Sequence, residues 1–233
     1  MKSDELDESL TLATAAAIDD AWTSWGRLDT DVIAHLINPS FLGGPVWPAL
    51  RQAHTITRRD NALLVASSGL ADPTAWDDAE PTNGYELEVY GISADLPADS
   101  DTMTVATSWL GDLVRSVSNQ VAHFGFRVSG MLDRYDLVTL ALPDLDFADG
   151  ADAYLDDGMA VVMLGLTDTE LPATVAGPLS SIRLVNVKLL TAAEGRFCVS
   201  NAIGDDNARR ELARRFAEQG RPLWSSLSRP SVV

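Results

Sequence analysis

Cysteine is almost absent from this sequence of 233 residues, which contains only Cys198. A single cysteine cannot form an intrachain disulfide, and it excludes zinc or redox motifs that need paired cysteines. Histidine is also scarce, and His35, His54 and His123 share no metal-ligand spacing. We therefore predict neither a metal nor any other cofactor.

Long apolar runs are missing as well. The N-terminus, Met1 to Glu5, is acidic and unlike a signal peptide. One of the longest apolar stretches, Met159 to Leu166, is far shorter than the ~20 residues that a membrane-spanning helix needs. Together with the lack of disulfides, these features predict a cytoplasmic protein that contacts no membrane.

Basic residues are outnumbered two to one, with 17 Lys and Arg against 34 Asp and Glu and a formal net charge of −17. Such a polyanion is repelled by phosphate backbones and anionic lipid surfaces, so we expect no nucleic-acid partner. A basic protein is an electrostatically natural partner. The alternative is that the acidic surface serves only solubility.

The best-patterned stretch runs from residue 84 to residue 142. An alternating segment, 84–91, predicts a strand with one buried face and one solvated face. Apolar residues at spacings of three and four predict one long helix from Asp101 to Phe124, stopped by Gly125. An apolar run over 137–142 predicts a second strand.

Other segments complete the expected secondary structure. We expect helices over 9–25, from Asp29 to the residues before Pro39, and from Asp205 or Asp206 to Gln219. Thr167 or Asp168 could cap a short turn of helix. Strands are expected at 54–58, 62–66, 126–128, 159–164, 182–190 and 197–199. The fold class is therefore α+β: a mixed or antiparallel sheet covered by a long central helix and by terminal helices, in a single domain, 1–233.

No catalytic motif is complete. Glu86 and Glu88 share a strand face and could form an acid/base pair, but a solvated sheet face gives the same pattern, and we favour that interpretation. Ser67-Ser68-Gly69 lacks the first glycine of a nucleophile elbow, and no phosphate-binding glycine motif is present. An enzyme assembled from the scattered residues Glu86, Glu88 and His54 remains the alternative hypothesis.

Two acidic segments are candidate binding sites, one for calcium and one for a basic protein. Asp144, Asp146, Asp149 and Gly150 resemble a calcium loop in composition, but the spacing is wrong and the twelfth position holds no Glu. The segment 72–81 places Trp76 among carboxylates, and we predict a contact patch for a basic partner at Trp76, Asp77, Asp78 and Glu80. The alternative is a Trp76 that packs this loop against the core.

Four short motifs give the chain a resemblance to the suppressor of fused domain family, especially its bacterial members. They are Leu63-Leu64-Val65 followed by Ser67-Ser68-Gly69-Leu70, Gly84-Tyr85-Glu86-Leu87, Trp109-Leu110-Gly111-Asp112-Leu113, and Gly165-Leu166-Thr167-Asp168-Thr169-Glu170-Leu171. The resemblance covers roughly residues 40–195, with the helical N-terminal and C-terminal segments packed on that core. Glu88-Val89-Tyr90 departs from the family's usual Thr-Phe-Arg.

The resemblance implies a domain that is not an enzyme and that works by binding another protein. In its bacterial form it implies an immunity protein that neutralises a toxin. A regulatory or structural domain unrelated to toxins is the other interpretation.

Overall fold

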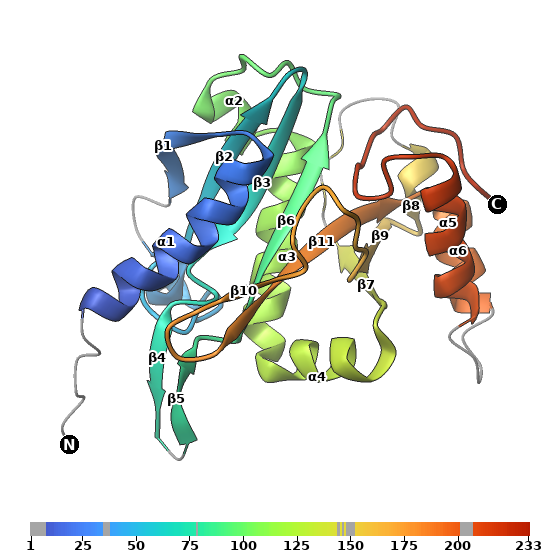
Figure 1. The fold of residues 1–233 in the computed structure, drawn as a ribbon. Helices are drawn as coiled ribbons and strands as arrows, with labels where there is room; N and C mark the ends of the chain where they lie inside the picture. The colour runs from blue at the N-terminus through green and yellow to red at the C-terminus, as the bar shows by residue number, and fades with distance from the viewer. Residues whose placement is uncertain are drawn as a thin grey trace.

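A mixed sheet forms the centre of the structure, a computed structural model that describes residues 8–34, 38–77, 79–143, 145, 147, 152–200 and 207–233. Its strand order is β1-β2-β3-β6-β11-β9-β7, with β10 added to β11 and β8 added to β9 (Figure 1). The central pair β6–β11 is parallel, and the other neighbouring strands are antiparallel. A separate two-stranded hairpin contains β4 and β5.

The element bounds give the fold in full. The strands are β1 Arg27–Ala34, β2 Ala53–Arg59, β3 Ala62–Ser68, β4 Pro73–Trp76, β5 Ala79–Asn83, β6 Leu87–Ser93, β7 Val138–Pro143, β8 Leu155–Asp156, β9 Met159–Leu164, β10 Thr174–Ala176 and β11 Ser181–Leu190. The helices are α1 Glu8–Trp25, α2 Thr102–Ala106, α3 Trp109–Phe124, α4 Phe126–Tyr135, α5 Ala192–Ser200 and α6 Asn207–Glu218, with short 3-10 turns η1 Pro39–Leu42 and η2 Asp152–Tyr154. The predicted α+β class with a mixed sheet is confirmed.

Helix α3 covers one face of the sheet, and α1 and α6 lie on the other (Figure 1). The side chains of α3 that contact the sheet recur every three or four residues, as the sequence predicted; they are Leu110, Leu113, Val114, Val117 and Val121. On the opposite face, Trp22 of α1 packs on Tyr90 of β6 with ring centroids 5.4 Å apart. The sheet therefore separates two apolar cores.

The long predicted helix is divided in two. Asp101 caps α2 by accepting a hydrogen bond from the Thr104 backbone N–H, and Ser108 caps α3 by accepting one from Gly111. Gly125 ends α3 with a φ of 58°, a left-handed conformation that favours glycine. The predicted stop at Gly125 is confirmed, and the predicted single helix is wrong at residues 107 and 108.

Three segments adopt the opposite structure to the one predicted. The helix expected from Asp29 is strand β1, because Thr30, Val32 and Ile33 are β-branched and the segment pairs with β2; residues 35–37 lie outside the described residues. The strand expected at 126–128 is the start of α4, which buries Val128 and Leu132 one turn apart.

The third is the strand expected at 197–199, which lies inside α5 and buries Cys198. The short turn of helix that Thr167 or Asp168 was expected to cap is also absent, since residues 169–171 form a turn and a bend and not a helix. The caps proposed for the last helix, Asp205 and Asp206, lie outside the described residues, while the helix itself is confirmed as α6.

A projecting hairpin with an aromatic cluster

The predicted acidic loop 72–81 is mostly a β-hairpin, made of β4 and β5, that extends beyond the sheet in Figure 1. Its base is fixed by Asn83, which is fully buried. The Asn83 Oδ1 accepts hydrogen bonds from the backbone N–H groups of Leu179 and Ser180, each 3.0 Å long, and its Nδ2 donates to Thr14 of α1 at 2.7 Å. A rigid base therefore holds the hairpin in a fixed direction.

Three aromatic rings meet beside this hairpin, and we call Trp76, Tyr85 and Phe126 the aromatic cluster. Trp76 stacks on Tyr85 with centroids 5.7 Å apart, and Phe126 contacts both rings edge-on at 5.2 and 5.6 Å. Trp76 and Tyr85 are half-buried, and Phe126 is 42% exposed. Burial raises the pKa of the Tyr85 hydroxyl above its ordinary value.

The residues predicted as a contact patch lie on this hairpin. Asp77 and Glu80 are exposed, and Asp78 lies outside the described residues. Trp76 donates from Nε1 to the Thr82 hydroxyl at 2.8 Å, so its polar edge is held within the hairpin. Its ring packs on Tyr85 and Phe126, the two members of the cluster that sequence reasoning missed.

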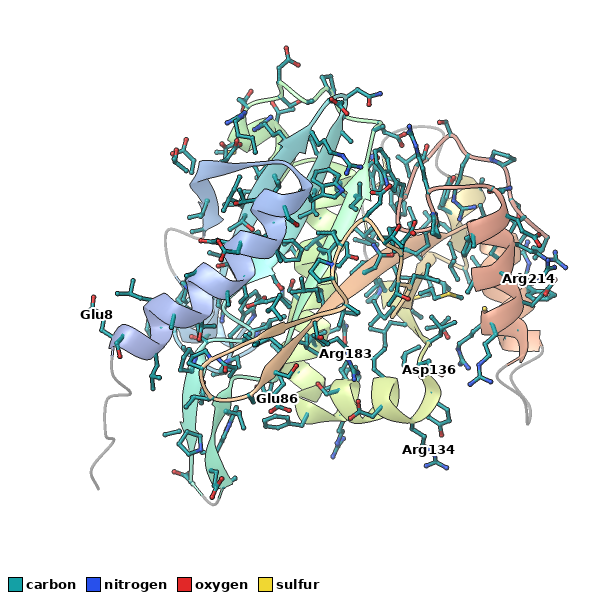
Figure 2. The ribbon with its side chains drawn as sticks, viewed as in Figure 1. Glu8, Glu86, Arg134, Asp136, Arg183 and Arg214 are labelled. Atoms are coloured by element: carbon teal, nitrogen blue, oxygen red, sulfur yellow. The ribbon has the colours of Figure 1, made fainter. Side chains whose placement is uncertain are left out.

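The strand predicted over 84–91 begins only at Leu87. Gly84 and Glu86 both have left-handed backbone conformations, with φ values of 49° and 61°, and they form a turn instead. Gly84 is required there because a Cβ would lie 2.1 Å from the Leu70 carbonyl oxygen. Figure 2 labels Glu86 near the start of α4, and the Ser129 hydroxyl of that helix donates to the Tyr85 carbonyl at 2.9 Å.

The predicted solvated position of Glu88 is wrong. Its side chain is fully buried and accepts hydrogen bonds from the Ser67 hydroxyl and from the backbone N–H groups of Gly69 and Ala71. Burial raises the pKa of the Glu88 carboxyl to about 7, although these three hydrogen bonds oppose the shift. The α1 face of the sheet is covered at this point, which a two-residue alternation cannot reveal.

The three residues of the enzyme hypothesis do not form a common site. Glu86 lies in the turn before β6, Glu88 is enclosed by the Gly69–Ala71 backbone, and His54 lies under α3, 3.3 Å from the Ser118 hydroxyl. Glu88 has no exposed surface through which a substrate could reach it. This arrangement gives no geometry for acid/base catalysis by these residues.

The described part of the chain contains neither a metal-binding group of side chains nor a reactive thiol. There, no group of three or more His, Cys, Asp or Glu side chains is placed to hold a metal ion. The acidic residues compared with a calcium loop, Asp144, Asp146 and Asp149, lie outside the described residues. Burial raises the pKa of the Cys198 thiol to about 11, which disfavours the reactive thiolate.

Among the described helices, none has the length and apolar character to cross a membrane.

No protein-family model matches the chain, and no curated protein matches it in sequence. Among solved structures, the crystal structure of Drosophila Suppressor of Fused aligns with a TM-score of 0.48 at 12% identity, covering 94% of this chain and 51% of that one. The chain thus spans about half the length of that protein.

Proposed function

We propose that this chain is a protein-interaction domain that acts by binding another protein, and that its contact surface is the β4–β5 hairpin with the aromatic cluster. One observation carries the proposal: three mutually packed rings, one of them 42% exposed, lie beside a projecting hairpin with a rigid base. Aromatic side chains are enriched at the centres of protein interfaces because they bury large areas at low entropic cost.

The negative charge beside the aromatic cluster favours a partner with a basic surface. Asp77 and Glu80 are exposed carboxylates on the hairpin, and the chain as a whole carries −17. Complementary charge steers association and increases its rate. A basic protein is therefore the partner that we propose, with its basic side chains near Asp77 and Glu80 and an apolar group on the rings.

In its narrower form the proposal is a cytoplasmic immunity protein that neutralises a basic toxin. The support is the negative charge together with the motif resemblance to bacterial suppressor of fused domains. A regulatory domain that binds a basic protein other than a toxin would use the same surface. The identity of the captured partner separates these two forms.

The test is affinity capture from a lysate of the cell that makes the protein, followed by mass spectrometry. Wild-type protein, Trp76→Ala and Phe126→Ala are compared with Phe41→Ala, which removes a 72% exposed aromatic ring outside the cluster. Central aromatic anchors contribute strongly to binding, so each cluster variant should weaken partner binding by about tenfold or more. Phe41→Ala should bind like wild type.

Three outcomes would contradict parts of the proposal. Capture of the same partner by all four proteins would place the interface away from the hairpin. Capture of no partner by wild type would argue against the interaction function itself. Binding that is insensitive to salt between low and moderate ionic strength would remove the argument for a basic partner.

A further inference from the structure

A pocket of about 410 Å³ lies beside α4, where β11 changes its neighbour. Strand β11 pairs with β10 through residues 181–183 and with β9 from Val187 onward, while β6 occupies its other edge. Within the described ranges, residues 184–186 of β11 pair with no strand on that side. The chain from β9 to β10 and the end of α4 form the walls of the resulting pocket.

Arg183 supplies the positive charge in this pocket. Its Nη1 is buried and has no hydrogen-bond partner among the residues that the structure describes. Its Nη2 donates to Asp133 at 2.5 Å, but the Asp133 side chain is 65% exposed, and exposed ion pairs are weak. An arginine has five N–H donors, so this one keeps donor capacity for a ligand.

Two hydroxyl groups accompany the guanidinium. Thr174 is the register partner of Arg183 across the β10–β11 pair, so their side chains lie next to each other on one face. Thr167 lies on the wall that follows β9. Hydroxyl groups donate hydrogen bonds to carboxylate oxygens, as the guanidinium does in a charge-assisted form.

The rest of the lining is mainly apolar. Val185 is two residues from Arg183 on the same strand and therefore points to the same face, towards Leu132 of α4. Both side chains belong to the core on the α3 side of the sheet. The pocket thus joins a cationic, hydroxyl-bearing side to an aliphatic side.

The charges around the pocket are balanced, unlike those of the whole chain. Asp133 is paired with Arg183, and Asp136 is paired with Arg210 at 3.3 Å. Figure 2 shows Arg183 above α4 and Asp136 at the end of that helix. Asp136 lines the pocket itself, so the four groups named here place two guanidinium groups beside two carboxylates and sum to no net charge.

We propose that this pocket binds an aliphatic carboxylate. The carboxylate pairs with Arg183 and accepts hydrogen bonds from Thr167 and Thr174, and the aliphatic group packs on Leu132 and Val185. Two sources share this chemistry, a free small carboxylic acid and the C-terminal residue of a polypeptide. The site is independent of the hairpin and of the partner proposed above.

The test uses three probes on the full-length chain, followed by NMR of the labelled methyl groups of Leu132 and Val185. Isovalerate and N-acetyl-L-leucine carry a carboxylate, whereas N-acetyl-L-leucinamide has the same aliphatic group and no charge. Both acids should shift the two methyl signals, and the amide should not. Arg183→Gln should weaken binding of the acids by about tenfold or more, because a charge-assisted hydrogen bond is lost.

The tighter acid identifies the source: N-acetyl-L-leucine if a polypeptide terminus binds, and isovalerate if a small acid binds. Arg196→Gln is the matched control, because Arg196 also pairs with one partly exposed carboxylate, that of Asp156, but does not line the pocket. Thr174→Val, a smaller change, should weaken binding severalfold and serves as a second variant. Absent shifts, equal shifts with acid and amide, or unchanged affinity in both pocket variants would overturn the proposal.

Discussion

Glu88 and Glu194 are both fully buried, yet the fold moves their pKa values in opposite directions. Each carboxylate accepts two backbone N–H hydrogen bonds, from Gly69 and Ala71 in one case and from Thr191 and Val232 in the other. Burial alone therefore does not decide the charge state of either residue. The difference lies in the remaining neighbours.

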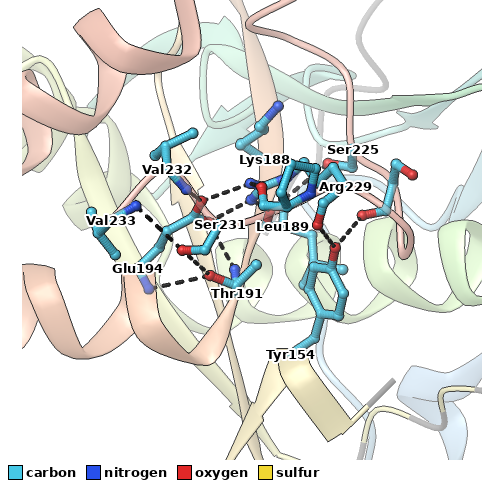
Figure 3. A network of polar contacts seen from close by, with 12 residues as sticks. Tyr154, Lys188, Leu189, Thr191, Glu194, Ser225, Arg229, Ser231, Val232 and Val233 are labelled. Atoms are coloured by element: carbon cyan, nitrogen blue, oxygen red, sulfur yellow. Dashed lines mark hydrogen bonds and ion pairs between the residues drawn. The ribbon is translucent and has the colours of Figure 1, made fainter. Parts of the chain in front are cut away.

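Glu194 has a cation of its own. Arg229, from the C-terminal tail, donates to both carboxylate oxygens at 2.6 and 2.5 Å (Figure 3). Burial raises the pKa of Glu194, but the Arg229 hydrogen bonds and charge, with the Thr191 and Val232 N–H groups, bring it below its ordinary value. Thr191 and Glu194 also cap each other at the start of α5, so this charge joins a helix to the tail.

Among the residues that the structure describes, none supplies Glu88 with such a cation. The nearby Arg51 pairs with Asp72 instead, to which its Nε donates at 2.9 Å. Burial raises the pKa of Glu88, and the negative charge of Asp72 raises it further. Of the two carboxyl groups, the one that pairs with a guanidinium has a lowered pKa, and the one with three hydrogen bonds and no cation has a raised pKa. Glu194 should behave as a fixed charge, and Glu88 as a titrating group.

Removing the cation from Glu194 should have the largest effect. Arg229→Met leaves a buried carboxylate unpaired, and breaking such a pair costs about 3–5 kcal/mol of the free energy of unfolding. The measurement is urea denaturation near neutral pH. The loss should shrink as the pH falls, because protonation then removes the unpaired charge. This should begin above the ordinary pKa of Glu194, since without Arg229 burial raises the pKa of this carboxyl.

Two variants control for the loss of arginine itself. Arg214→Met removes an arginine whose ion pairs with Glu211 and Glu218 lie on the exposed side of α6, and it should change stability little. Glu194→Gln combined with Arg229→Met should recover part of the stability lost in Arg229→Met. If the double variant is less stable than Arg229→Met, the unpaired charge is not the cause.

Glu88→Gln should reveal the opposite pH dependence. The ordinary pKa of 4.5 applies to the unfolded chain and about 7 to the folded protein, so the folded state holds this proton in between. The stability that Glu88 contributes is fully present below the unfolded pKa and is lost as the pH rises through the folded pKa. Relative to Glu88→Gln, wild type should lose about 3 kcal/mol across this window.

The measurement is the free energy of unfolding of both proteins at a series of pH values, since other titrating groups cancel in their difference. Gln has the shape of Glu and can still accept the Gly69 and Ala71 hydrogen bonds. If the free energies of unfolding of the two proteins differ by a constant amount between pH 4.5 and about 7, burial does not raise the pKa of Glu88.

The position of Glu88 also marks what the sequence could and could not predict. The helix α3 was predictable because its apolar spacing is a property of consecutive residues. The burial of Glu88 was not, because the same alternation describes a wet face and a face covered by distant segments. Here the Gly69–Ala71 backbone covers it, and only the folded chain brings that backbone to Glu88.

The candidate contact surface was predictable in part for the same reason. Trp76, Asp77 and Glu80 are close in sequence, so composition alone could single them out. Tyr85 lies beyond the hairpin. The sequence predicts a strand at Phe126, because an aromatic residue followed by Arg127 and Val128 favours β structure. The left-handed Gly125 restarts the chain as a helix and turns Phe126 onto the other two rings.

The smallest expected effect is that of Ser67→Ala, which tests how far one hydrogen bond opposes the effect of burial on the pKa of Glu88. Ser67→Ala removes a hydroxyl group that stabilises the carboxylate, so the pKa of Glu88 should rise further above its ordinary value. Stability should fall by about 1 kcal/mol, since the Val89 N–H also loses its bond to the Ser67 oxygen, 2.9 Å long. The stability difference between Ser67→Ala and the double variant Ser67→Ala/Glu88→Gln is measured against pH. Its midpoint should lie at higher pH than the midpoint for wild type and Glu88→Gln.

Ser93→Ala is the matched control for this last prediction. Ser93 is as buried as Ser67, and its hydroxyl accepts the Asp95 N–H at 3.0 Å, but it does not touch Glu88. Its removal should lower stability without moving the midpoint. If Ser67→Ala leaves the midpoint unchanged, the hydroxyl group does not oppose the effect of burial on the pKa of Glu88, and only the two backbone N–H groups do.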